Sequence, residues 1–316
     1  MTKFNFIISK TGTRYHFILS IAGINPIMKD SFVEHYQKLI GPLSTNEETI
    51  LANIRKQMDL LPENDRKTLL RNSFLLTEQQ FKKSLSSFDL LELFDCLDNK
   101  FESHWNITIK EIKKSLSVIQ EAFITEKSTI NKAINTLGIL FKNKAPEQIE
   151  IYLMSSPINN ISGKLISPGL VYIEIPRNEN IELKKFWLVL IHEIIHACFE
   201  SFEYKMWLKD FAEKQIQIPL TIKMGPKNIL RELVDEAIAP NGYFANYLYS
   251  MDIINKLENE LSKNKGLDFK NDREEFNYLK KVVALNLFKF LDSYIKESKL
   301  IDEKILEIIW ESILNQ

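Results

Sequence analysis

Residues 186–191 form an unbroken apolar run, Phe-Trp-Leu-Val-Leu-Ile, and two histidines and a glutamate follow it directly. A helix through this run has no polar face, so it must be buried on nearly all sides. His192, Glu193 and His196 would then be buried as well, and buried polar side chains are costly unless hydrogen bonds or a metal satisfy them. We therefore expect a buried helix over residues 181–199, in which His192, Glu193 and His196 belong to one site.

His192, Glu193 and His196 have the spacing H-E-x-x-H. Side chains four residues apart lie on the same face of a helix, so both imidazoles can reach one metal ion. Zinc binds neutral imidazole nitrogens, and a catalytic zinc site commonly has three protein ligands and a water. Glu193 would lie where it can take the proton of that water. The alternative is a buried helix whose histidines are satisfied by hydrogen bonds alone.

A third zinc ligand is expected downstream, where no further histidine follows His196. The next amphipathic helical pattern carries Glu232 and Glu236 on one face. Its Asp-Glu-Ala sequence at residues 235–237, together with the H-E-x-x-H motif, resembles the gluzincins, the thermolysin-like clan of zinc peptidases. In that clan a second helix supplies a glutamate ligand.

The resemblance implies a zinc ion held by His192, His196 and Glu236, with Glu232 as the second choice for the third ligand. It covers about a third of the chain, roughly residues 149–249, and it is more specific for a zinc site than for any one substrate.

Two supporting roles are also implied by the resemblance. In thermolysin-like enzymes an aspartate four residues after the ligand glutamate supports the first histidine, and that position here holds Pro240. Asp235 is the carboxylate expected to take over this orienting role. The clan also uses a tyrosine to stabilise the oxyanion, and Tyr243 is our choice among three nearby tyrosines, the others being Tyr247 and Tyr249.

Two strands are predicted just before the motif. Residues 149–154 and 170–175 are rich in β-branched and aromatic side chains, and the Pro168-Gly169 pair marks a turn between them. The gluzincin core similarly places a small sheet before its zinc-binding helix. We therefore expect an α+β, predominantly α-helical fold, in which a small antiparallel or mixed sheet packs on the zinc-binding helix between extensive helical flanks.

The region before these strands divides into two patterns. Residues 4–21 alternate around a polar turn and then become apolar, which predicts a β-hairpin. Residues 26–143 show apolar side chains at helical spacing, with capping-box starts at Ser44 and Thr77. Pro146 then marks a boundary.

The predicted division is therefore a region over residues 1–145, with the hairpin and helices, and a gluzincin-like zinc domain with C-terminal helices over residues 146–316.

Composition excludes several other classes. The net charge is −1 and no basic run with interleaved aromatic residues occurs, which argues against a nucleic-acid partner. No segment approaches the roughly 18 apolar residues of a membrane span. Two cysteines, Cys96 and Cys198, do not make a disulfide framework. With no convincing signal peptide, a cytoplasmic location is expected.

The sequence thus predicts a zinc metallopeptidase acting on a peptide or protein substrate, in which Glu193 activates a zinc-bound water and Tyr243 stabilises the oxyanion. Two alternatives stay open. One is a zinc hydrolase of non-peptide amides or esters, and the other is a non-catalytic helical protein in which zinc fixes two helices and the flanks bind a protein partner. An intact Glu193 counts against the second, because a structural site has no use for a base.

Overall fold

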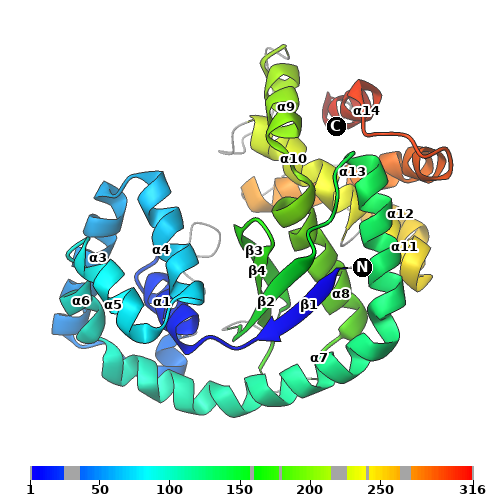
Figure 1. Ribbon diagram of the computed structural model, residues 1–316. Helices are drawn as coiled ribbons and strands as arrows, with labels where there is room; N and C mark the ends of the chain where they lie inside the picture. Colours follow the sequence, from blue (N-terminus) through cyan, green and yellow to red (C-terminus); the bar gives the residue numbers. More distant parts are fainter. Residues whose placement is uncertain are drawn as a thin grey trace. The chain divides into compact units, whose positions relative to one another are not determined.

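The computed structural model describes residues 2–24, 36–156, 160–177, 180–214, 226–239, 242–263 and 272–314 (Figure 1). The chain forms two compact units, each built from separated segments. Unit 1 comprises Met1–Lys3, Ile124–Gln148 and Glu182–Gln316, and unit 2 comprises Phe4–Phe123 and Ile149–Ile181. This division differs from the predicted boundary near Pro146, because the strands after that residue join unit 2 and the preceding helix ends in unit 1.

Unit 2 contains a small sheet and a group of helices. Its elements are β1 (Lys3–Ile7), α1 (Lys10–Ile21), α3 (Thr45–Leu60), α4 (Glu63–Leu75), α5 (Glu78–Ser86), α6 (Leu91–Asp95), the first part of α7 (Asp98–Leu140), β2 (Gln148–Ser155), β3 (Ser162–Ser167) and β4 (Leu170–Ile175).

Among the described residues of unit 1, the regular elements are helices, apart from Lys3 and Gln148 at the starts of β1 and β2. Its elements are the second part of α7, α8 (Leu183–Ile194), the π-helical turn η1 (Ile195–Phe199), α9 (Phe202–Lys214), α10 (Pro226–Ile238), α11 (Tyr243–Tyr249), α12 (Ile253–Lys263), α13 (Asp272–Lys296) and α14 (Glu303–Leu314).

The four strands form one mixed sheet in the order β1-β2-β4-β3. β2 runs parallel to β4, and β3 pairs with β4 antiparallel across the turn at Gly169, whose φ of 74° suits glycine. β2 and β4 match the two strands expected from the sequence. The predicted fold class, α+β and predominantly α-helical with a small sheet, is confirmed. The sheet lies in unit 2 and α8 in unit 1, so packing of the sheet on α8 stays a prediction.

The predicted N-terminal β-hairpin is wrong. β1 forms as expected, but residues 10–21 form α1, which begins where the Ser9 hydroxyl accepts a hydrogen bond from the Gly12 amide. α1 is buried along nearly its whole length, with Tyr15 and Phe17 among its fully enclosed side chains. A helix that is buried on all sides has the same kind of continuous apolar sequence as a buried strand. The pattern of residues 15–21 therefore did not distinguish a helix from a strand.

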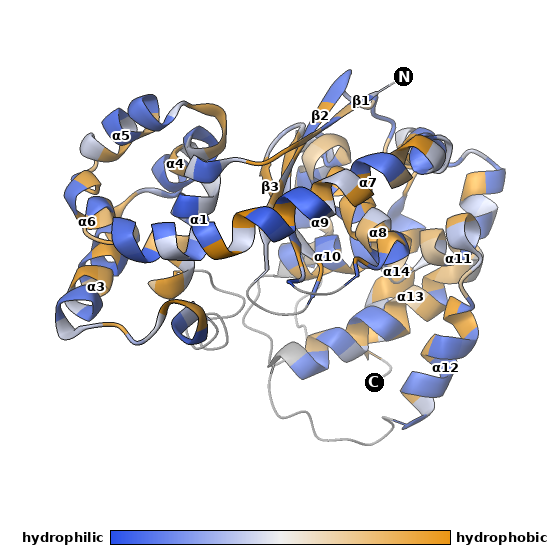
Figure 2. Cartoon of the chain, turned by 90° about the horizontal axis from the view of Figure 1, so that it is seen from below, coloured by the Kyte–Doolittle hydropathy of each residue, from blue (hydrophilic) through white to orange (hydrophobic). Residues whose placement is uncertain are grey.

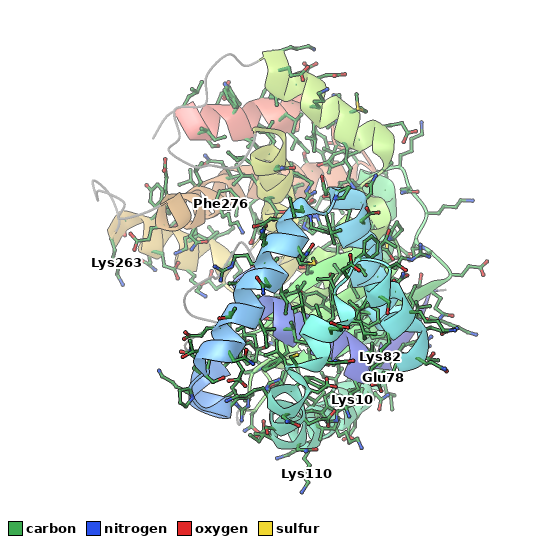
Figure 3. All side chains as sticks on the ribbon, turned by 90° about the vertical axis from the view of Figure 1, so that its left-hand side faces the viewer. Lys10, Glu78, Lys82, Lys110, Lys263 and Phe276 are labelled. Atoms are coloured by element: carbon green, nitrogen blue, oxygen red, sulfur yellow. The ribbon has the colours of Figure 1, made fainter. Side chains whose placement is uncertain are left out.

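Ion pairs fasten α1 within the helical group of unit 2. The Arg14 side chain is almost fully buried, and its guanidinium contacts Asp95 at 2.8 Å and Asp98 at 2.5 Å. Lys82 adds a contact to Asp95 at 3.4 Å and lies beside Glu78 on α5 (Figure 3). Buried charge is tolerated only when paired, so this cluster holds α1 against the start of α7.

The capping boxes at Ser44 and Thr77 are confirmed at the starts of α3 and α5. In unit 1, hydrophilic and hydrophobic residues alternate around α12 and α13 (Figure 2), as expected for helices with one buried face. α8 differs, because every residue from Phe186 to Ile194 is buried. Among the described residues, no helix is both long and apolar enough to cross a membrane.

Candidate metal centre

The H-E-x-x-H motif lies where α8 changes into a π-helical turn. His192 and Glu193 are in α8, and His196 is in η1, which ends as the Glu200 amide donates to the Ile195 carbonyl at 3.2 Å. The Asn143 side chain donates to the Cys198 carbonyl at 3.0 Å. The sequence predicted one regular helix to residue 199, whereas a π turn widens its last turn, a feature found often at functional sites.

α10 supplies the second wall of the centre. Glu232, Asp235 and Ala239 are spaced i, i+3 and i+7, so they lie along one side of the helix and its C-terminal end. Glu236 is rotated from Glu232 by about 40° in the opposite direction to Asp235. This rotation turns it toward α13, where its carboxylate contacts the Lys280 ammonium at 2.6 Å.

Three donor groups converge between α8, η1 and α10. The Nε2 atoms of His192 and His196 are 3.1 Å apart. The Glu232 carboxylate oxygens lie 3.9 Å from the first of these atoms and 3.6 Å from the second. Two ligands about 2.1 Å from a tetrahedral zinc ion are about 3.4 Å apart. The three groups therefore surround a single point at close to zinc-ligand spacing.

The partners of the other ring nitrogens fix the tautomers. His192 Nδ1 is 2.8 Å from the Ala239 carbonyl oxygen, and His196 Nδ1 is 2.7 Å from a Glu200 carboxylate oxygen. Both partners only accept, so each Nδ1 carries the proton and donates it. When neither Nε2 is protonated, each imidazole points a lone pair at the other, and two lone pairs 3.1 Å apart repel unless a proton or a metal ion lies between them. The donor set fits a zinc ion.

A buried carboxylate supports His196. Glu200 is fully enclosed, and besides His196 it contacts Arg231 Nε at 3.2 Å and Lys205 Nζ at 3.1 Å. Asp235 also lies 3.1 Å from His196 Nδ1 and is fully buried. Acceptors behind a metal-binding imidazole orient its ring and raise its basicity. Asp235 was expected in such a role, but it faces His196, while the Ala239 carbonyl orients His192.

The two carboxylates differ in protonation. Burial alone would raise the pKa of Glu200, but the hydrogen bond and charge of His196 and the charge of Arg231 outweigh it and lower the pKa to about 2. Burial, and then the negative charge of Glu200, raise the pKa of Asp235 well above its usual range. Within this pair, Glu200 is therefore the carboxyl that ionises more readily, and Asp235 keeps its proton more readily.

Glu232 is also ionised at neutral pH. Burial would raise its pKa, but His196, His192 and Arg231 outweigh this effect and hold the pKa below the usual range. Its side chain keeps 21% of its surface exposed, more than either imidazole. The centre thus opens to solvent on the Glu232 side, as a site with a free coordination position must.

The two candidates for the third ligand have different neighbours. Glu236 was preferred because of its Asp-Glu-Ala context, but its carboxylate pairs with Lys280, whereas Glu232, the second choice, lies near both imidazoles. The geometry therefore favours Glu232, and the identity of the ligand stays a prediction. A rotation of α10 by about 40° with a shift of about 6 Å along its axis would bring Glu236 to the position of Glu232. The packing of α10 on α13 sets this rotation. The position of Pro240, four residues after Glu236, lies outside the described residues.

The two residues expected to act in catalysis are placed differently. Glu193 follows His192 in α8 and is buried, with 5% of its surface exposed. The Tyr243 hydroxyl donates to Asp292 at 3.0 Å, and Tyr243 stacks on Tyr247 with ring centroids 5.1 Å apart. This hydrogen bond joins α11 to α13. The Tyr243 hydroxyl could donate to a substrate only if its hydrogen bond to Asp292 were broken.

Sequence reasoning missed Glu200 and the Ala239 carbonyl. Glu200 could have been found, because it lies four residues after His196 and such a pair shares a helix face. The carbonyl carries no side-chain signal and depends on where α10 ends. No protein-family model, curated protein or solved structure matches the chain.

Proposed function

We propose that the chain is a zinc-dependent hydrolase, most simply a metallopeptidase of gluzincin type. The observation that carries the proposal is the pair of imidazole Nε2 lone pairs 3.1 Å apart beside the Glu232 carboxylate, with both tautomers fixed from behind. His192, His196 and Glu232 would hold the ion. Zinc, when bound, polarises a carbonyl and lowers the pKa of water.

Glu193 is the proposed general base. It takes a proton from the attacking water and later passes it to the leaving amine, as a carboxylate next to a metal ligand can do. Three protein ligands with one partly exposed side support a catalytic site over a structural one, which closes with four. Tyr243 is left out of this proposal because its hydroxyl is bonded to Asp292. A peptide or protein is the substrate class that the resemblance implies.

The test compares Glu193→Gln with wild type for zinc content and for hydrolysis of a peptide library. We expect Glu193→Gln to keep stoichiometric zinc and the thermal transition, but to lose about 10²–10⁴-fold in hydrolysis, the usual contribution of a positioned base. The matched control is Glu203→Gln, which removes the same charge from an exposed side chain of α9 and leaves activity unchanged.

The same experiment separates the alternatives. Hydrolysis of amide or ester reporters without peptide cleavage, lost in Glu193→Gln, assigns a non-peptide substrate. Stoichiometric zinc without hydrolysis of any of these substrates replaces the enzyme proposal with a structural centre. Absence of zinc binding by wild-type protein rejects the metal site itself.

A further inference from the structure

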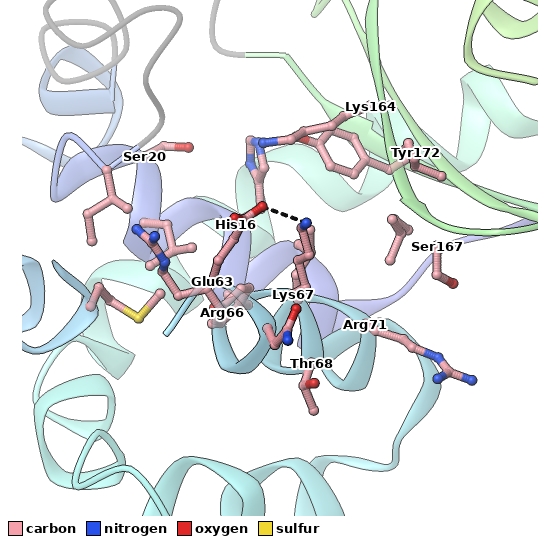
Figure 4. A pocket seen from close by; sticks show the side chains of 18 of the residues that line it. His16, Ser20, Glu63, Arg66, Lys67, Thr68, Arg71, Lys164, Ser167 and Tyr172 are labelled. Carbon is pink, nitrogen blue, oxygen red and sulfur yellow. Dashed lines mark ion pairs between the residues drawn. The ribbon is translucent and has the colours of Figure 1, made fainter. Parts of the chain in front are cut away.

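Unit 2 contains a cavity that the proposed zinc chemistry does not use (Figure 4). Its volume is about 660 Å³, within the roughly 300–1,000 Å³ of small-molecule sites. Side chains of α1, α4 and β3 form its walls, together with Tyr172 of β4. All these residues belong to unit 2, so the cavity exists within a single compact unit.

The interior of the cavity is largely apolar. Met58 and Ile166 are buried, and Leu19 and Leu70 contribute partly buried surface. Such walls favour a ligand with a hydrocarbon portion, since apolar surface removed from water is worth about 25 cal/mol per Å².

The rim of the cavity is cationic. Arg66, Lys67 and Arg71 of α4 line it, and Lys164 of β3 lies opposite, whereas Glu63 is the one carboxylate among the lining residues that the structure describes. Glu63 is already paired with Lys67 at 2.5 Å (Figure 4). Among the described residues, no carboxylate lies within ion-pair distance of Arg66 or Arg71. The surplus positive charge therefore favours an anionic head group.

Two buried polar groups face the same space. His16 is held by Glu174 at 2.9 Å, and the other Glu174 oxygen accepts from Ser162 at 2.7 Å. Tyr15 lines the cavity, and its fully buried hydroxyl has no hydrogen-bond partner in the described part of the chain. Buried hydroxyl groups almost always have a partner, and Arg66 is close enough for its charge to act on this phenol. A ligand oxygen that accepts from the Tyr15 hydroxyl would supply the missing partner.

We propose that unit 2 binds a small amphipathic carboxylate in this cavity, with its hydrocarbon chain on the apolar walls and its carboxylate at Tyr15 and Arg66. The Tyr15 hydroxyl and the guanidinium donate to the carboxylate oxygens. A cavity of this size suits a molecule with a short chain better than a folded partner.

The test is calorimetric titration of the full chain with dodecanoate below its micelle concentration. We expect saturable one-to-one binding, and none with dodecyltrimethylammonium, which has the same chain and the opposite charge. Tyr15→Phe removes a hydroxyl that has no protein partner, so the fold should persist while dodecanoate binding weakens about three- to tenfold.

The contribution of the rim cations is tested with the double variant Arg66→Gln/Arg71→Gln. The matched control is the double variant Lys113→Gln/Lys114→Gln, which replaces two exposed lysines of α7 in the same unit. Each rim cation is expected to contribute about two- to fivefold, so the rim pair should weaken binding by roughly four- to 25-fold and the control pair by less than twofold. Equal loss in both pairs, no saturable binding by wild type, or binding of acidic peptides in place of dodecanoate would overturn the proposal. None of these results bears on the zinc centre.

Discussion

Replacing Glu232 by alanine should weaken zinc binding far more than replacing Glu236. Both residues lie on α10, one helical turn apart, and both changes remove one carboxylate. Only Glu232 faces the imidazoles, at 3.6 Å from His196 Nε2 and 3.9 Å from His192 Nε2. Glu236 contacts Lys280 instead.

The magnitude follows from the number of ligands. Four-ligand zinc sites bind with apparent free energies of about 10–16 kcal/mol at pH 7, which is about 2.5–4 kcal/mol per ligand. Loss of Glu232 should therefore raise the zinc dissociation constant roughly 10²–10³-fold. Glu236→Ala removes an ion pair with a partly exposed lysine, worth up to about 1 kcal/mol of folding stability, and should change zinc affinity by less than about threefold.

The assay is competition for zinc against a chromophoric chelator at pH 7, on Glu232→Ala, Glu236→Ala and Glu232→Gln. Circular dichroism melts in excess chelator show whether each variant still folds without metal. Glu232→Gln keeps the shape and removes the charge, so its loss should fall between wild type and Glu232→Ala. If Glu236→Ala loses zinc and Glu232→Ala keeps it, α10 presents its next turn to the imidazoles in solution and our ligand assignment fails.

Three further results are expected. Glu200→Gln should weaken zinc binding about 10–100-fold, as loss of a partner behind a ligand does. Asp235→Asn should bind zinc nearly normally, because the raised pKa of that carboxyl favours its uncharged form. Equal losses of zinc affinity in the same chelator competition would contradict this assignment. Burial, then nearby positive charge, lowers the pKa of His104 to about 3, so stability present above pH 6.5 is lost as pH falls toward 3, and His104→Phe should remove about 2 kcal/mol of the loss between pH 7.5 and 5 in urea unfolding. Gly242→Ala would place a Cβ 1.8 Å from the Ala237 carbonyl oxygen and should lower the free energy of unfolding by about 1–3 kcal/mol; an unchanged melting temperature would show that the turn is less tight.

The features predicted well from the sequence are those with local physical causes. The apolar run before His192 indicated α8, and two β-rich segments indicated β2 and β4. The capping boxes at Ser44 and Thr77 mark helix starts because their hydrogen bonds join residues only three positions apart. In each case the interactions that decide the structure lie within a few residues.

The errors arose where distant packing decides the outcome. α1 was taken for a strand because enclosure by other helices, which no local pattern reveals, allows an apolar helix with no polar face. The choice between Glu232 and Glu236 as third ligand likewise could not be made from the sequence, since the two differ by only about 40° around the helix. The rotation of α10 is set by its packing on α13, where Lys280 binds Glu236.

α10 determines more of the metal centre than its single ligand suggests. Glu232 supplies a donor, Asp235 lies behind His196, and the Ala239 carbonyl fixes the tautomer of His192. Because these groups are spaced i, i+3 and i+7 on one rigid helix, any shift of α10 moves all of them together. In the proposed metal site, the lone pairs of His192 and His196 would be completed only when α10 is docked on α8. Zinc bound there would stabilise that docking in return, because a ligand that binds only the folded form shifts the folding equilibrium.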